Sequence, residues 1–182
     1  YKAAPALAQE ALVEQARLRF WRDAARELCR EAGAGAVLLS CDRHYGWPQA
    51  FLHAARRLGL GTALLPYAMT GQDWYPRRHE PLLRLDLPAQ RLAKRWLARR
   101  HPGQVHRSPH GELLFYSPAR TLTLAGLDML PPHPWSVGGG RADLVLAAGP
   151  EERRRMVEEG RAPEAVAATG LPSHDQLHRA GR

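Results

Sequence analysis

A short polar segment follows the first strand-like run of this chain, and it contains residue types that transfer protons. The apolar run 36–40 is followed by Cys41, Asp42, Arg43, His44 and Tyr45. Ligands of open α/β sheets bind outside the carboxyl ends of parallel strands. At such a position Asp42 can orient a hydroxyl group or act as a base, and His44 can carry a proton. The alternative is that Asp42 caps the loop and His44 is simply exposed.

A second candidate position lies after the next apolar run, 62–65. Tyr67 and Thr70 follow this run, at the carboxyl end of a strand that we expect beside the first. Their side chains should then converge with those of Asp42 and His44 on one cleft. Glu80 is the nearest further acid, and it belongs to a charged run that is more often a solvated loop.

Apolar periodicity predicts the elements that hold these residues. We expect helices over 6–31 and 48–58, the second ended by Gly59 and Gly61. The first helix should pack through the face formed by Val13, Ala16, Phe20, Ala24 and Leu28.

Four short apolar runs are predicted to be neighbouring parallel strands, because helix-length segments connect them. The runs are 36–40, 62–65, 144–148 and 166–169, with a helix over 151–159 before the last. A run that is apolar throughout, such as 36–40, indicates a strand buried on both faces. The sequence therefore predicts an α/β, Rossmann-like three-layer domain with a mainly parallel sheet. We expect it to span residues 1–182 as one domain, with an irregular insertion over about 67–140.

The insertion contains an arginine-rich helix, predicted over 88–100 with Asp86 as its cap. Its apolar face should hold Leu92, Trp96 and Leu97, and its opposite face Arg91, Lys94, Arg95 and Arg99. A helix of this kind can lie on an anionic membrane, with Arg91, Lys94, Arg95 and Trp96 facing the lipid. The alternative is that the helix packs on the sheet. Leu113–Tyr116 is predicted to be a further strand.

The charge of the chain is strongly positive, +8 over 182 residues, and arginine carries nearly all of it. An arginine excess fits an anionic partner or simply a GC-rich genome. Nucleic-acid binding is the poorer explanation, because the arginines are dispersed and no recognition motif accompanies them. Cys29 and Cys41 have no disulfide or zinc spacing, which indicates a reducing, cytoplasmic location.

Two sequence patterns resemble functional motifs but do not have the required context or spacing. Gly59-x-Gly61 precedes a strand instead of following one, so it is not a dinucleotide fingerprint. His101, His106 and His110 lie around proline and glycine residues with no regular metal-ligand spacing. We therefore predict no metal site and no tightly bound cofactor.

The last third of the chain carries a more specific pattern. An apolar strand and a short helix are followed by a strand that ends in Thr169-Gly170-Leu171-Pro172-Ser173-His174-Asp175. This segment, together with the strand that ends at Asp42, resembles the N-terminal domain of GT-B-fold glycosyltransferases and of UDP-N-acetylglucosamine 2-epimerases. The resemblance covers roughly 36–70 and 134–175, less than half of the chain.

The resemblance implies the acceptor-side half of an enzyme of surface or capsular polysaccharide synthesis. Its substrate would be a nucleotide sugar, held mostly by a second domain that we do not expect within this chain, and its acceptor a sugar or a lipid-linked sugar. The enzyme would be cytoplasmic and peripheral to the inner face of the membrane. Asp42, His44 and Glu80 become catalytic candidates. The substrate-binding candidates are Arg43, Tyr45, Tyr67, Thr70, Gly170, Ser173 and Asp175.

One departure from the family pattern matters. Tyr67 stands where the epimerases carry their catalytic glutamate, and no histidine precedes it. This counts against epimerase chemistry and keeps a second hypothesis open, a non-catalytic Rossmann-like binding domain.

Overall fold

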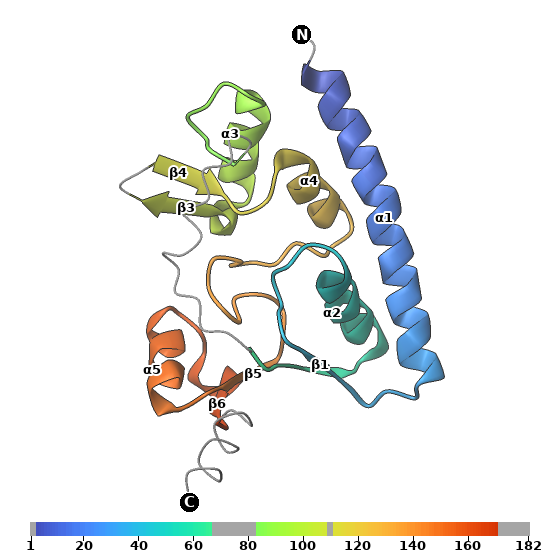
Figure 1. The fold of residues 1–182 in the computed structure, drawn as a ribbon, viewed down its shortest axis with the longest axis vertical. Helices are drawn as coiled ribbons and strands as arrows, with labels where there is room; N and C mark the ends of the chain where they lie inside the picture. Colours follow the sequence, from blue (N-terminus) through green and yellow to red (C-terminus); the bar gives the residue numbers. More distant parts are fainter. Residues whose placement is uncertain (1–2, 67–82, 109–110, 171–182) are drawn as a thin grey trace, which may run out of the picture.

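The computed structural model describes residues 3–66, 83–108 and 111–170, and it shows an α/β protein with a Rossmann-like fold (Figure 1). Four parallel strands form the main sheet in the order β1-β2-β5-β6. Their bounds are β1 (Ala36–Leu39), β2 (Gly61–Leu64), β5 (Leu144–Ala147) and β6 (Val166–Ala168). The prediction that these segments are neighbouring parallel strands is confirmed.

Short helices make the crossovers between paired strands. Helix α2 (Trp47–Leu58) joins β1 to β2, while α5 (Pro150–Glu158) and the 3-10 turn η3 (Pro163–Ala165) join β5 to β6. Each crossover helix has proline in its first turn, where the missing N–H has no intrahelical partner to lose. Gly59 ends α2 with a φ of 69°, a left-handed conformation that glycine adopts at little cost.

One face of the sheet carries the main core. Its buried residues form a cluster that joins the sheet to both crossover helices: Val37, Leu39, Leu64, Val145, Ala147 and Val166 with Leu52, Ala55 and Met156. Successive side chains of a strand point to opposite faces. Leu38 accordingly lies on the other face of β1 and is 61% exposed. The prediction that 36–40 is buried on both faces is therefore wrong for this strand.

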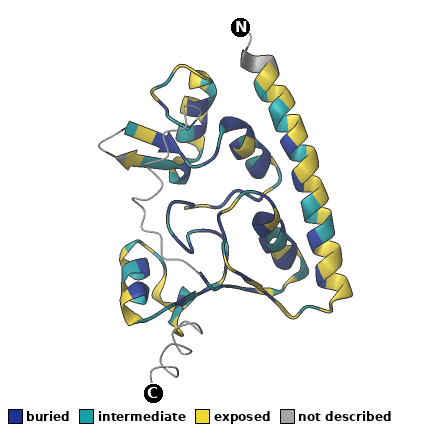
Figure 2. Cartoon of the chain, viewed as in Figure 1, coloured by how far each residue is buried: buried dark blue, intermediate teal, exposed yellow. Residues whose placement is uncertain are grey.

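The long helix α1 (Ala3–Glu31) packs along α2 and α4, but through a face that the periodicity did not predict. Its buried residues are Glu14, Leu18, Ala25 and Cys29. Leu18 and Ala25 lie against the small residues Ala50 and Ala54 of α2, in one cluster. The predicted face points away from the protein, with Phe20 67% exposed. Figure 2 shows exposed residues along the outer side of this helix.

Between β2 and β5 lies a small substructure with its own core of Leu85, Leu97 and Leu114. It contains α3 (Arg91–Arg100), η2 (Pro102–Gln104), the antiparallel hairpin of β3 (Val105–Ser108) and β4 (Gly111–Leu114), and α4 (Pro118–Gly126). The predicted strand 113–116 overlaps β4. Helix α4 escaped prediction because threonine and glycine are poor helix formers; the Thr123 hydroxyl donates to the carbonyl oxygen of Ala119 at 2.8 Å.

Candidate functional site

Asp42 follows β1 as predicted, but the protein encloses it. The residue is 1% exposed, and its Oδ2 accepts a hydrogen bond from the backbone N–H of Gly140 at 2.8 Å. A Cβ on Gly140 would overlap that oxygen and lie 2.6 Å from the Asp42 carbonyl oxygen, so only glycine allows this approach. Burial raises the pKa of the Asp42 carboxyl, and the Gly140 hydrogen bond opposes that rise. Asp42 therefore connects two loops and exposes no surface to a substrate.

Arg43 is also held inside the protein. It is 5% exposed, and its guanidinium donates to the carbonyl oxygens of Pro134 at 3.4 Å and Trp135 at 3.1 Å. The Tyr116 hydroxyl donates to the Arg43 carbonyl oxygen. Because these contacts join segments about 90 residues apart, Arg43 has a clear structural role, which does not require a substrate.

The next two residues of this loop differ in exposure. His44 is exposed, so it is the titratable side chain of this loop that a substrate can reach. Tyr45 is half-buried; its hydroxyl donates to the Glu14 carbonyl oxygen at 3.5 Å, and the Arg120 guanidinium lies 4.8 Å from its ring centre. Burial raises the pKa of the Tyr45 hydroxyl.

The predicted convergence of the remaining candidates stays a prediction. Tyr67, Thr70, Glu80, Ser173 and Asp175 lie outside the described residues. Gly170 follows β6, at the far edge of the sheet from β1. Three strand spacings separate these two edges, roughly 14 Å. Asp42 and Gly170 therefore do not line one small site.

The arginine-rich helix is real but shorter than predicted, and its predicted faces are only partly right. Leu97 is buried and the three arginines of the helix face are exposed as predicted, whereas Leu92 and Trp96 are exposed. It begins at Arg91 after Gln90, and Asp86 does not cap it; Asp86 pairs instead with Arg84, Oδ1 to Nε at 3.0 Å. Lys94, predicted to face a membrane, is fully buried. Its ammonium donates to the carbonyl oxygens of Arg84 and Leu87, and burial lowers the pKa of Lys94. The assignment of Lys94 to a membrane-facing surface is wrong, because these carbonyls bind it inside the substructure.

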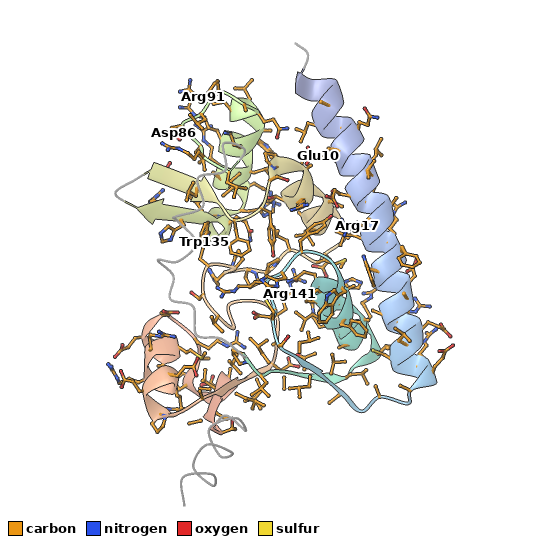
Figure 3. All side chains as sticks on the ribbon, in the orientation of Figure 1. Glu10, Arg17, Asp86, Arg91, Trp135 and Arg141 are labelled. Carbon is orange, nitrogen blue, oxygen red and sulfur yellow. The ribbon has the colours of Figure 1, made fainter. Side chains whose placement is uncertain are left out.

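The outer face of α3 combines exposed apolar and cationic side chains. Leu92 is 86% exposed and Trp96 56% exposed. Arg91, Arg95 and Arg99 are exposed on the same helix and make no ion pair with the described residues. Figure 3 shows Arg91 projecting from α3 at the edge of the molecule. We call this surface, formed by Leu92, Trp96, Arg91, Arg95 and Arg99, the α3 ridge.

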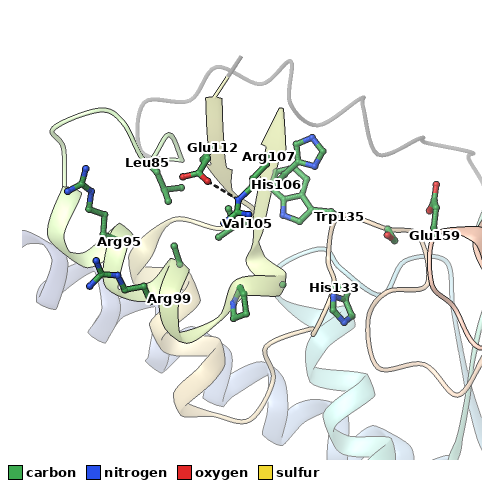
Figure 4. A pocket seen from close by; sticks show the side chains of 14 residues that line it. Leu85, Arg95, Arg99, Val105, His106, Arg107, Glu112, His133, Trp135 and Glu159 are labelled. Carbon is green, nitrogen blue, oxygen red and sulfur yellow. Dashed lines mark hydrogen bonds and ion pairs between the residues drawn. The ribbon is translucent and has the colours of Figure 1, made fainter. Parts of the chain in front are cut away.

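A broad hollow of about 940 Å³ borders the α3 ridge. Arg95 and Arg99 belong to both, and Figure 4 shows them projecting from α3. The lining of the hollow as a whole contains three arginines, Arg95, Arg99 and Arg107, against two glutamates, Glu112 and Glu159. Glu112 pairs with Arg107, Oε1 to Nε at 2.9 Å. Arg95 and Arg99 make no ion pair with the described residues, so they give this end of the hollow a positive charge, which suits a phosphate group.

Trp135, on the lining of the hollow, is held by contacts inside the protein. The His106 ring lies 4.9 Å from the ring of Trp135, centre to centre, and the Trp135 indole N–H donates to the Gln104 carbonyl oxygen at 2.9 Å. Gln104 is itself buried, and its amide donates to the Pro131 carbonyl oxygen at 2.6 Å. Sequence reasoning missed this arrangement. The signal that could have found it is Trp135, an aromatic residue within the proline-rich segment 131–135.

Two further observations concern metal binding and membrane spans. Within the described residues no group of three or more histidine, cysteine, aspartate or glutamate side chains could hold a metal ion. Among the helices described, none is both long enough and apolar enough to cross a bilayer.

No protein-family model, no curated protein sequence and no solved structure matches this chain. The fold and the surfaces described above must therefore carry any functional argument.

Proposed function

We propose that this domain is the acceptor-side half of a GT-B-type glycosyltransferase of surface or capsular polysaccharide synthesis, acting on a phosphate-bearing lipid-linked acceptor. The observation that carries the proposal is the α3 ridge, where Leu92 and Trp96 stand exposed beside a hollow, among arginines that make no ion pair with the described residues. Apolar side chains of this kind enter the headgroup region of a membrane, and arginines bind its phosphates. The reaction class rests on the sequence resemblance around Asp42 and Thr169.

In this proposal the residues of the α3 ridge and the β1–α2 loop have different roles. Leu92 and Trp96 insert at the lipid surface, while Arg95 and Arg99 hold the acceptor phosphate at the mouth of the hollow. A second domain binds most of the nucleotide sugar. The acceptor hydroxyl oxygen bonds to the anomeric carbon of the donor, the bond from that carbon to the diphosphate breaks, and the hydroxyl proton passes to a base. His44 is the exposed candidate for that base in the β1–α2 loop, since Asp42 is enclosed.

Vesicle binding tests whether the α3 ridge binds an anionic membrane. The chain should sediment with vesicles that contain phosphatidylglycerol or a polyprenyl phosphate, and not with phosphatidylcholine alone. Replacing Arg91, Arg95 and Arg99 by Gln should weaken this binding about 100-fold, since each basic residue contributes on the order of 1 kcal/mol at an anionic surface. Trp96→Ala should weaken it as well.

A matched variant separates local recognition from net charge. Arg26, Arg30 and Arg57 are exposed arginines on α1 and α2, and changing all three to Gln removes the same charge. This control should bind vesicles almost as well as the wild type. Equal loss in both triple variants, or wild-type binding to neutral vesicles, contradicts the proposal. Tight binding of duplex DNA that survives Trp96→Ala would favour a nucleic-acid role instead.

A second candidate is a non-catalytic Rossmann-like binding domain. The specific observation in its favour is that Asp42 and Arg43, two of the predicted site residues, are occupied by the 134–140 loop. In a longer protein that contains this domain, transfer of labelled sugar from a nucleotide sugar to a hydroxyl group of a polyprenyl-diphosphate-linked sugar separates the two. Lipid binding without transfer supports the non-catalytic domain.

A further inference from the structure

A second hollow, of about 390 Å³, also borders the η2 turn, and we call it the η2 hollow. It lies among the end of α3, the end of α4 and the segment 128–132. It shares Pro102 and Gly103 with the larger hollow beside the α3 ridge, and its other lining residues are different. Its volume falls within the roughly 300–1,000 Å³ of small-molecule sites. The two hollows can therefore bind different ligands.

Gln104, on the lining of the η2 hollow, has a hydrogen-bond acceptor without a donor. The residue is 1% exposed, and its Oε1 has no hydrogen-bond partner among the described residues. Its backbone N–H donates to the His101 carbonyl oxygen at 3.0 Å, and its side-chain amide donates to the Pro131 carbonyl oxygen at 2.6 Å. Its backbone carbonyl oxygen accepts from Trp135 and Phe115. Because buried polar atoms are nearly always bonded, Oε1 is the atom of Gln104 that calls for a donor from outside the chain.

The charged groups of the η2 hollow leave one arginine without an ion pair. The Asp128 carboxylate is already neutralised, because its Oδ1 lies 2.9 Å from Arg141 Nη1 and its Oδ2 lies 3.7 Å from Arg56 Nη1. Arg100 is exposed and makes no ion pair with the described residues. Burial and the nearby charge of Arg100 lower the pKa of His101, so its ring is neutral in neutral solution and can donate one hydrogen bond and accept another.

We propose that the η2 hollow binds a small hydroxylated carboxylate, such as a hexuronic acid. The ligand carboxylate pairs with Arg100, whose planar guanidinium matches a carboxylate through two parallel hydrogen bonds. A ligand hydroxyl group donates to Gln104 Oε1, and the neutral His101 ring bonds another hydroxyl group. A dianionic phosphate fits less well, because its second charge would meet the Asp128 carboxylate and the carbonyl oxygens at the end of α3. This inference does not depend on the proposed function, which places a phosphate in the other hollow.

Nuclear magnetic resonance with glucuronate as the probe tests the site. Glucuronate should shift the backbone amide signals of Leu130 and Arg141, which line the η2 hollow, and not that of Arg95, which lines the larger hollow. For a ligand of this size we expect a dissociation constant of about 0.1–1 mM. Arg100→Gln should raise it roughly 10-fold, because it removes a charge-assisted hydrogen-bonded pair. Arg99→Gln removes the same charge one residue away, on the lining of the larger hollow, and should leave the dissociation constant unchanged.

Two simpler probes separate the two contacts. Acetate offers only the carboxylate and glucose only hydroxyl groups, so each should bind at least about 5-fold more weakly than glucuronate. Gln104→Met removes the buried acceptor and should reduce the affinity for glucuronate to that for acetate. If the Leu130 and Arg141 signals do not move in millimolar glucuronate, the proposal is overturned, and equal weakening in Arg99→Gln and Arg100→Gln overturns it too.

The probes also test each contact alone. Acetate that binds as tightly as glucuronate overturns the role of Gln104, and glucose that does so overturns the role of Arg100. If circular dichroism shows that Gln104→Met is unfolded, the comparison of glucuronate with acetate in the wild type decides whether the hydroxyl groups are recognised.

Discussion

Removing the Asp42 carboxylate should destabilise the protein, because Asp42 connects the β1–α2 loop to the loop before β5. In Asp42→Ala the buried N–H of Gly140 loses its acceptor, which lies 2.8 Å away in the wild type. A buried donor without a partner costs about 1–3 kcal/mol, and the space left by the side chain adds about 1 kcal/mol. We expect the free energy of unfolding to fall by about 2–4 kcal/mol, and the melting temperature of a domain this size by roughly 5–15 °C.

Asp42→Asn separates the hydrogen bond from the charge. Asparagine keeps an acceptor oxygen for Gly140 and removes a buried negative charge, so its cost should stay below about 1 kcal/mol. Gly140→Ala tests the same contact from the other side. Its Cβ would lie 2.6 Å from the Asp42 carbonyl oxygen, and overpacking of this kind costs about 1–3 kcal/mol.

Urea unfolding followed by circular dichroism measures these differences. Asp86→Ala is the control, because it removes an exposed carboxylate with a single surface ion pair, and it should leave the midpoint unchanged. If Asp42→Ala unfolds at the wild-type midpoint, the structural reasoning is refuted. If its stability is kept while the sugar transfer proposed above falls in a protein with both domains, Asp42 is a catalytic group after all.

Three further predictions follow from buried groups. The folded-state pKa of Asp42 is raised, so the part of the free energy of unfolding that is linked to its protonation is complete below the unfolded pKa of about 4 and is lost as the pH rises through the folded value; the melting temperature of Asp42→Asn relative to wild type should therefore increase between pH 4 and pH 7. Lys94→Ala should lower the urea midpoint strongly, because it leaves two carbonyl oxygens without their donor, whereas Arg95→Ala on the exposed face should not. Trp135→Phe should lower the free energy of unfolding by about 0.5–1.5 kcal/mol, since the Gln104 carbonyl oxygen loses the indole N–H but keeps the Phe115 backbone N–H, and thermal melts with and without this change measure it.

The secondary structure and the parallel sheet could be predicted because their signals are local. Gly59 ends a helix through its own backbone freedom, and proline in the first turn marks where α2 and α5 begin. Short apolar runs joined by helix-length connections leave few topologies other than a parallel sheet. Helix α4 was missed for the same local reason, since its threonines and glycine carry no helix signal of their own.

Which side of each element is buried was decided only by the tertiary structure. Both α1 and α3 have apolar residues on the expected faces, yet Phe20 and Trp96 point outward while Leu18 and Lys94 are buried. Apolar periodicity describes a single helix. Which side of that helix is buried also depends on the shape and the polar groups of the surface against which it packs. Small alanines on α2 select one face of α1, and the backbone carbonyl oxygens of Arg84 and Leu87 make an interior place for a lysine ammonium.

The role of Asp42, like the buried faces of α1 and α3, was decided by the tertiary structure. Its position after a parallel strand was evident from the sequence, but its partner Gly140 lies 98 residues away. Nothing local distinguishes an aspartate that meets a substrate from one that binds a distant backbone N–H, because both follow a strand and both are polar. In the folded chain, the loop that contains Gly140 lies over the Asp42 carboxylate and excludes water from it. This contact decides that Asp42 binds a backbone N–H.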